Sequence, residues 1–161
     1  MRRLAWLMLP LLMAGALLLA GCSTVKGYLF PPGEKLDWDS LSLYVDPAAN
    51  RDFPLAVDLV FVADEALAKR VAAMKAADWF GARDALRNAN RDALQVVSLE
   101  LAPGDSLTLP EKRIPDTRLF AALVFADYFA PGEHSARLEK LAGKVAIEFG
   151  ATELSVHATE K

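Results

Sequence analysis

The sequence has 161 residues, a formal net charge of -3 and a single cysteine. This length suits one domain, and the slightly acidic balance disfavours nucleic acid as a partner, because nucleic-acid binding needs a basic face. One cysteine excludes a disulfide within the chain, so the stability of the fold must come from packing.

The first 21 residues have the layout of an export signal. Arg2 and Arg3 are followed by an uncharged run from Leu4 to Ala20, which ends in the small pair Ala20-Gly21. A membrane-spanning anchor is the alternative, because this 17-residue run reaches the lower limit for crossing a bilayer. The small residues at its end favour cleavage.

The segment Leu19-Ala20-Gly21-Cys22 is similar to the bacterial lipobox, which implies that Cys22 becomes the acylated first residue of the mature chain. Ser23 resembles a residue that permits sorting to the outer membrane. We therefore expect a lipoprotein signal peptide over residues 1–21, with an ordinary cleaved signal as the alternative. The expected protein has a covalent lipid on Cys22 and no other cofactor, and it lies on the outer membrane facing the periplasm.

Cleavage before Cys22 would leave 140 residues, with 16 basic side chains against 21 acidic ones and a formal charge of -5. Residues 22–39 are predicted to form an acylated tether, because they contain Pro31, Pro32 and two glycines without a regular apolar period. The folded domain is expected over residues 40–161.

The domain opens with two predicted strands. In residues 40–45, Leu41, Leu43 and Val45 alternate with polar positions, which is typical of a strand with one buried face. Residues 54–63 carry one apolar row and one mixed row that contains Asp58.

A helical insert is predicted at about residues 64–92. Asp64 resembles a helix N-cap, and Leu67, Val71 and Met74 follow it at helical spacing. A second helix is expected after them, with a basic flank that consists of Arg83, Arg87 and Arg91. The aromatic residues Trp79 and Phe80 are expected to pin these helices to a sheet.

Strand patterns return after the insert. They lie at 93–102, 106–109, 118–129, 136–139, 144–150 and 152–158, and Pro103-Gly104 predicts a type II turn between the first two. The total of seven or eight short strands with regular turns predicts a mainly β protein, an antiparallel β-sandwich. Residues 119–125 are apolar on both faces, so we expect a central strand that the helices cover.

Candidate catalytic residues are few. A Ser/His/Asp set is conceivable from Asp127, His134 and Ser135, but adjacent residues in a turn do not easily converge on one substrate. The other possibility is an acidic cluster that binds a cation. Its members would be Asp37, Asp39, Asp46 and Asp52. The simpler interpretation is that these residues belong to turns, in which aspartate is common. We therefore expect no enzyme, no catalytic residue and no metal site.

Several motifs in order resemble the outer-membrane lipoprotein of type VI secretion systems, the TssJ/SciN family. The matching segments are Pro54-Leu55, Ala77-Asp78-Trp79-Phe80, Leu101-Ala102-Pro103-Gly104-Asp105-Ser106 and Ala122 to Tyr128. The resemblance implies a transthyretin-like β-sandwich with added helices. It also implies a non-enzymatic scaffold that ties an inner-membrane TssM-type subunit to the outer membrane.

The same resemblance implies that the partner contacts the loop between the first two strands, here Asp46 to Phe53. We expect Asn50, Arg51 and Asp52 to supply donors and acceptors at the rim of that interface, with Phe53 beside them. The alternatives are an ordinary turn and, for Phe53, a place in the core.

A second function remains open from the sequence, a periplasmic lipoprotein that binds a small ligand or a cell-wall component. Its groove would lie between helices and sheet, lined by Trp79, Phe80 and Tyr128. An open apolar pocket there would favour this function, and a filled core would exclude that groove.

Overall fold

The computed structural model describes residues 33–139 and 141–159. The predicted signal peptide, Cys22 and the first part of the predicted tether therefore lie outside the described residues. The elements are β1 Glu34–Lys35, β2 Asp37–Val45, η1 Ala49–Asp52, β3 Leu55–Val62, α3 Glu65–Ala72, α4 Ala76–Ala89, β4 Leu94–Leu101, β5 Ser106–Thr108, η2 Glu111–Arg113, β6 Arg118–Leu119, β7 Ala121–Ala126, β8 Ser135–Arg137, β9 Ala142–Phe149 and β10 Leu154–Thr159.

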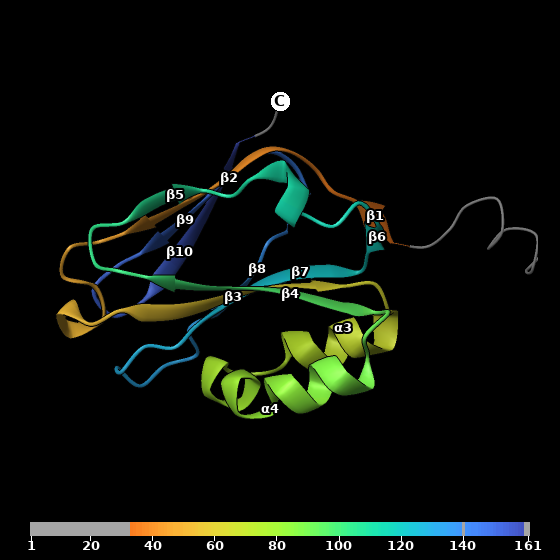
Figure 1. Cartoon of the computed structure of the whole chain (residues 1–161), viewed down its shortest axis with the longest axis horizontal. Helices are drawn as coiled ribbons and strands as arrows, with labels where there is room; N and C mark the ends of the chain where they lie inside the picture. The colour runs from red at the N-terminus through yellow and green to blue at the C-terminus, as the bar shows by residue number, and fades with distance from the viewer. Residues whose placement is uncertain (1–32, 140, 160–161) are drawn as a thin grey trace, which may run out of the picture. The chain divides into compact units, whose positions relative to one another are not determined.

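Two four-stranded sheets pack face to face, with strand orders β10-β9-β2-β5 and β4-β3-β7-β8. Helices α3 and α4 cover the outer face of the second sheet (Figure 1). The inter-sheet core contains Leu41, Leu59, Phe61 and Ile147, and the helix–sheet core contains Val60, Trp79 and Phe125. The predicted mainly β sandwich with a short helical insert is confirmed.

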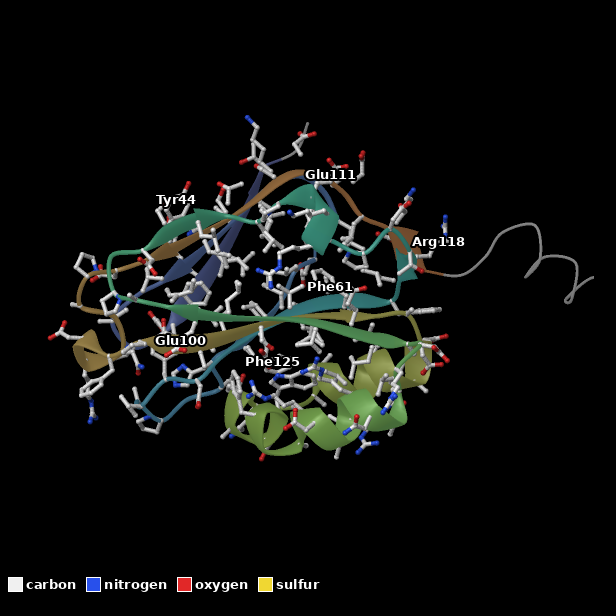
Figure 2. All side chains as sticks on the ribbon, in the orientation of Figure 1. Tyr44, Phe61, Glu100, Glu111, Arg118 and Phe125 are labelled. Carbon is white, nitrogen blue, oxygen red and sulfur yellow. The ribbon has the colours of Figure 1, made fainter. Side chains whose placement is uncertain are left out.

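The middle layer is buried on both sides. All six residues of β7 are buried, because alternate side chains enter the inter-sheet core and the helix–sheet core. Phe61 and Phe125 show the two directions, one toward each layer (Figure 2). This confirms the central strand that was expected from the apolar residues at 119–125.

Two details of the sandwich differ from the sequence-based expectation. The sandwich is not wholly antiparallel, because β2 and β9 pair in parallel with Leu41 opposite Val145. The described residues also contain the two-residue strands β1 and β6, which pair with each other and are too short to show a period of two.

The folded domain begins earlier than the predicted boundary at residue 40. Glu34–Lys35 form β1, and β2 starts at Asp37, so residues 33–39 belong to the sandwich and not to the tether. Leu36 and Trp38 pack against the inter-sheet core, and the rings of Trp38 and Phe61 lie 6.2 Å apart. Burial of these apolar side chains holds the segment in place. The nearby prolines are the reason that the sequence predicts a tether here.

The helical insert begins where the sequence predicts. Asp64 caps α3, since its Oδ1 accepts a hydrogen bond from the Leu67 N–H at 2.7 Å. Leu67 and Val71 then face the sheet. In the part of the chain that the structure describes, no helix is long and apolar enough to cross a membrane.

The central strand gives a stability prediction. Leu123 is 3% exposed, so Leu123→Ala should lower the free energy of unfolding by about 2–5 kcal/mol through lost burial and a residual cavity. Leu154→Ala, at a partly buried position of the edge strand β10, is the matched control and should cost less. Equal losses in urea denaturation would contradict the burial of Leu123.

Candidate functional site

Three loops meet at one end of the sandwich, at the left in Figure 1. They are residues 46–54 between β2 and β3, residues 127–134 between β7 and β8, and residues 150–153 between β9 and β10. We call this group of loops the tip. Backbone hydrogen bonds join the first loop to the end of β9, from Asp46 N to Phe149 O at 2.9 Å, and to the third loop, from Asn50 N to Ala151 O at 3.1 Å.

Asn50 is the residue that fastens these loops together. Its side chain is buried, with 3% of the residue exposed. Oδ1 accepts a hydrogen bond from the Phe129 N–H at 2.8 Å, and Nδ2 donates to the Pro54 carbonyl at 3.1 Å. The expectation that Asn50 offers its amide to the rim of an interface is therefore wrong, because backbone groups of the tip use both ends of that amide.

The backbone around Asn50 forms a left-handed turn. Asn50, Arg51 and Asp52 have φ values of 49°, 58° and 64°. Each such residue costs about 1–2 kcal/mol, although short polar side chains such as Asn and Asp tolerate the conformation better than arginine does. The hydrogen bonds of Asn50 offset this strain, and the side chains of Arg51 and Asp52 are left exposed.

An exposed aromatic pair lies beside this turn. Phe53 and Phe129 are 57% and 59% exposed, and their rings meet edge to face with centroids 5.4 Å apart. Single exposed apolar side chains are common, but adjacent large ones with polar neighbours indicate an interaction surface. Phe53 is thus not a core residue, and Phe129 is a surface partner that the sequence did not reveal.

The loop that carries Phe129 is itself held by Tyr128. The Tyr128 hydroxyl lies 3.0 Å from the Gly150 carbonyl and 3.1 Å from the Glu153 carbonyl, to which it donates. Burial of the phenol, with the nearby carboxylates of Glu153 and Asp46, raises the pKa of Tyr128 well above its usual value. The hydroxyl therefore stays protonated and keeps donating across the pH range in which the protein would work.

The groove expected for a small ligand is filled. Trp79 is fully buried and stacks on Phe125, with ring centroids 5.0 Å apart and an interplanar angle of 14°. Phe80 packs against the same helix–sheet core, whereas Tyr128 belongs to the inter-sheet core. These three aromatic residues do not line a common pocket, which removes the basis for the ligand-binding alternative.

A buried carboxylate explains how α4 is fixed to the sheet. Asp58 is 1% exposed, and its Oδ2 accepts hydrogen bonds from Trp79 Nε1 at 2.9 Å and from Arg83 Nη1 at 3.3 Å. The guanidinium of Arg83 also lies over the Phe80 ring, 5.2 Å from its centroid. A lone Asp within an apolar strand was the sequence signal for this network, since a buried charge requires a partner.

The histidine and serine of the conceivable catalytic set bond to different backbone groups. The His134 Nε2 lies 2.7 Å from the Ala130 carbonyl, and the Ser135 hydroxyl points to the Met74 carbonyl at 3.5 Å. His157 is exposed beside Ser155 and Glu148. Among the described residues no group of three or more His, Cys, Asp or Glu side chains is placed to hold a metal ion, the acidic residues at 37, 39, 46 and 52 included.

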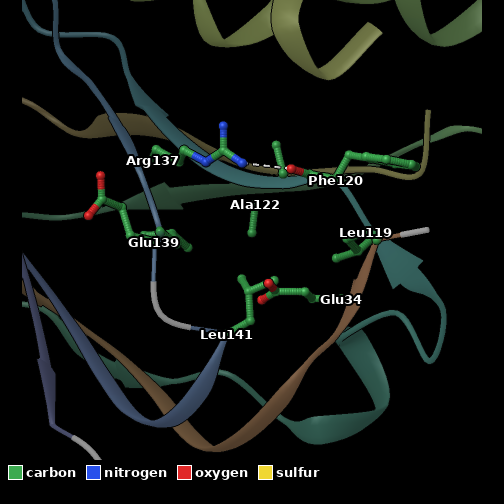
Figure 3. A pocket seen from close by; sticks show the side chains of 10 residues that line it. Glu34, Leu119, Phe120, Ala122, Arg137, Glu139 and Leu141 are labelled. Carbon is green, nitrogen blue, oxygen red and sulfur yellow. Dashed lines mark hydrogen bonds between the residues drawn. The ribbon is translucent and has the colours of Figure 1, made fainter. Parts of the chain in front are cut away.

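A hollow of about 340 Å³ opens at the opposite end of the sandwich, near β1 and β6 (Figure 3). The Glu34 and Glu139 carboxylates lie at its margin, and Arg137 Nη2 donates to the Phe120 carbonyl at 2.7 Å. Arg137 is the basic residue among the described residues that line the hollow, and it is thereby engaged with the backbone. These described residues do not bring a nucleophile and a base together.

Comparison with known proteins identifies solved structures with a similar fold. The sequence matches no protein-family model and no curated protein. Among solved structures it is similar to the T6SS lipoprotein TssJ1 from Pseudomonas aeruginosa, with a TM-score of 0.55 and 16% identity over 81% of this chain and 99% of that chain.

Two further structures have the same fold. One is Serratia marcescens Lip, a membrane-bound component of the type VI secretion system, with a TM-score of 0.51 and 15% identity over 74% of this chain and 96% of that chain. The other is a chain in the structure of the T6SS protein TssM C-terminal domain (869–1107) from EAEC, with a TM-score of 0.51 and 14% identity over 74% and 97%. The chain therefore has a TssJ-like fold.

The geometry of the tip gives a second prediction. Asn50→Ala should lower the free energy of unfolding by about 1–3 kcal/mol, because it leaves the Phe129 N–H and the Pro54 carbonyl without their partner. Arg51→Ala is the matched control in the same left-handed turn and should change stability by less than about 0.5 kcal/mol. Denaturant unfolding measures both, and a control loss as large as that of Asn50→Ala would show that the amide does not fasten the tip.

Proposed function

We propose that this protein is a lipid-anchored periplasmic scaffold subunit of a type VI secretion membrane complex and acts without catalysis. The observation that carries the proposal is the fold likeness to the T6SS lipoprotein TssJ1, which extends over 99% of that chain. The lipobox-like segment that ends at Cys22 stands before the folded domain, as an anchored subunit requires. The two observations are independent, since one concerns the sandwich and the other the leader.

The proposed anchor is the lipid on Cys22. A single acyl chain gives only marginal membrane binding, whereas two or three chains hold a protein durably, because each buried CH₂ contributes about 0.8 kcal/mol. Residues between Cys22 and Gly33 would then connect the membrane to the sandwich. With Ser23 after the cysteine, the outer membrane is the proposed destination and the periplasm the compartment of the domain.

The proposed partner is an inner-membrane subunit of the TssM type. One of the similar structures is that of the T6SS protein TssM C-terminal domain (869–1107) from EAEC. A chain of this fold in that structure supports association with a subunit of the TssM type.

The tip is the proposed contact surface. Phe53 and Phe129 form an apolar centre, and Arg51 and Asp52 supply charged groups at its rim, which is the usual composition of a protein interface. Asn50 acts underneath as the support of this surface. Because the turn is fixed before binding, association loses little loop entropy.

The anchor generates one prediction. Cys22→Ser removes the thiol that would carry the lipid, so the protein should move from the outer-membrane fraction to the soluble periplasmic fraction. Its melting temperature after purification should match that of the wild-type domain. Retention of the variant in outer-membrane vesicles would contradict the lipobox assignment.

The proposed contact surface gives a further prediction. The triple variant Arg51→Ala, Asp52→Ala and Phe53→Ala should weaken binding to the periplasmic domain of the TssM-type subunit at least tenfold, which is about 1.4 kcal/mol. Its melting temperature should change little, because the three side chains are exposed.

Isothermal calorimetry measures the binding, and the matched control replaces the three exposed residues of η2, Glu111–Arg113, by alanine. The control should bind as the wild type does. Wild-type affinity in the tip variant would place the contact elsewhere, and loss of binding in both variants would show that the loss is not specific to the tip.

A further inference from the structure

The outer edge of β4 is a surface that the proposed function does not use. The edge strands of the two large sheets are β4, β5, β8 and β10, and β4 is the longest of them, with eight residues. Natural proteins usually blunt a long edge with proline, lysine or a bulge. The β4 sequence LQVVSLEL contains no proline or lysine, and its register with β3 runs unbroken from Leu55↔Leu101 to Val62↔Leu94.

The register shows which backbone groups of β4 face outward. The Ala63 N–H donates to the Ala93 carbonyl at 2.8 Å, one position beyond the Val62↔Leu94 pair. In an antiparallel ladder, residues that bond to the neighbouring strand alternate with residues whose N–H and C=O point away. The odd-numbered residues of β4 therefore bond to β3, and the even-numbered residues point to the free edge.

The protein itself closes the two ends of this free edge. The Leu94 N–H donates to the Asn90 carbonyl at 2.8 Å, and the Ala102 N–H donates to Asp105 Oδ2 at 2.7 Å. Between them lie three residues whose outward backbone groups have no hydrogen-bond partner among residues 33–139 and 141–159: Val96, Ser98 and Glu100. The open stretch is therefore centred on Ser98.

A positive hollow lies beside the start of β4, on the helix side. It has a volume of about 530 Å³, and the residues that line it are Asp84, Arg87, Asn88, Arg91 and Leu94. Arg87 is exposed, and Arg91 donates to the neutral Asn88 side chain at 3.4 Å. Two arginines against the single carboxylate of Asp84 make the hollow net positive, since the exposed Asp92 does not line it.

The other end of β4 is negative on the same side. Leu94 and Val96 pack in the helix–sheet core. Alternate residues of a strand share one face, so Glu100 also lies on the helix side. It is exposed and lies near the tip end of the strand (Figure 2). Along its helix side, the edge of β4 thus runs from a positive start to a negative end.

We propose that two copies of this chain pair through their β4 edges, antiparallel and centred on Ser98, to form a two-fold symmetric dimer. Ser98 would lie opposite Ser98 of the second copy, and Val96 opposite Glu100. Each such pair exchanges two backbone hydrogen bonds, so every open group of the stretch finds a partner. A shift of the register in either direction would need the N–H of Leu94 or of Ala102, which is already bonded.

The charges fit this register. Glu100 of one copy lies opposite Val96 of the other, and the next residue on that face is Leu94, at the arginine hollow. Diagonal neighbours of this kind are about 7–8 Å apart, within reach of long side chains. The symmetry brings Glu100 to Arg87 and Arg91 at both ends of the pair, and it keeps the two Glu100 side chains apart. Opposite charges that meet in this way fix the register.

The helices leave room for the second copy. Trp79 and Arg83 of α4 bond to Asp58, which lies on β3, so this part of the helix is anchored one strand in from the edge. Three strand spacings, roughly 14 Å, would separate the anchored parts in the dimer. Helices in direct contact lie about 8–10 Å apart. The arginine side chains can therefore extend into the space between the two helices.

The inter-sheet side and the tip are also compatible with the dimer. On the inter-sheet side, the partly buried Leu99 would lie opposite Val97 of the second copy and gain apolar cover. The pairing uses no residue of the tip, so the inference is independent of the proposed contact surface.

Cysteine crosslinking of the full chain in detergent tests the register. In Ser98→Cys the two new thiols would lie at the symmetry axis, where paired Cα atoms are about 5.5 Å apart, a distance that a disulfide spans. The matched control is Gln95→Cys, an exposed position of the same strand whose two copies would lie about 20 Å apart. After mild oxidation we expect at least tenfold more disulfide-linked dimer from Ser98→Cys. Cys22 is common to both variants and does not affect the difference.

A charge exchange tests the same pairing without new thiols. In sedimentation, Arg87→Glu combined with Arg91→Glu should weaken the dimer at least tenfold, and so should Glu100→Arg alone, because like charges then meet. An equal mixture of these two variants should form a heterodimer with wild-type affinity, since opposite charges meet at both of its ends. The triple variant of the tip is the control and should dimerise as the wild type does.

Three results would overturn the proposal. They are a wild type that stays monomeric at every concentration, equal crosslinking from positions 95 and 98, and a mixture of the charge variants that does not recover the dimer. None of them bears on binding at the tip, which the triple variant tests separately.

Discussion

The buried amide of Asn50 is the interaction on which the proposed working end of the molecule depends. It bonds to backbone groups of its own loop and of the loop that carries Phe129. These bonds help to offset the strain of three consecutive left-handed residues. The bond from the Phe129 N–H to Asn50 ties together the two loops whose exposed phenylalanine rings meet.

The sandwich beneath the tip is rigid for a different reason. Strand β7 is buried on both faces, by the opposite sheet and by the two helices, and the Asp58 network locks α4 to the sheet. Close packing of this kind resists deformation. Loops that extend from such a layer can keep a strained shape, which would suit a subunit that transmits position between two membranes and makes no chemical change.

The sequence alone predicts the parts of this fold that depend on local chemistry. The Asp64 cap and the Pro103-Gly104 turn are examples, and Gly104 has the positive φ of 84° that the type II turn requires. The parallel pairing of β2 with β9 was not predictable, because residues about 100 positions apart decide it. At the site, the sequence indicated the loop at residues 46–53 as a candidate but did not reveal the burial of Asn50 or the exposed position of Phe129, since both depend on contacts between distant loops.

The central claim is that the tip is the surface presented to the inner-membrane subunit, and photo-crosslinking in cells tests it most directly. A photoreactive phenylalanine analogue replaces Phe129 at the tip in one strain and Glu111 of η2 in another. Both positions are exposed, and η2 lies away from the tip (Figures 1 and 2). The account predicts an adduct with the TssM-type subunit from position 129 and none from position 111. An adduct from position 111, with none from 129, would contradict it.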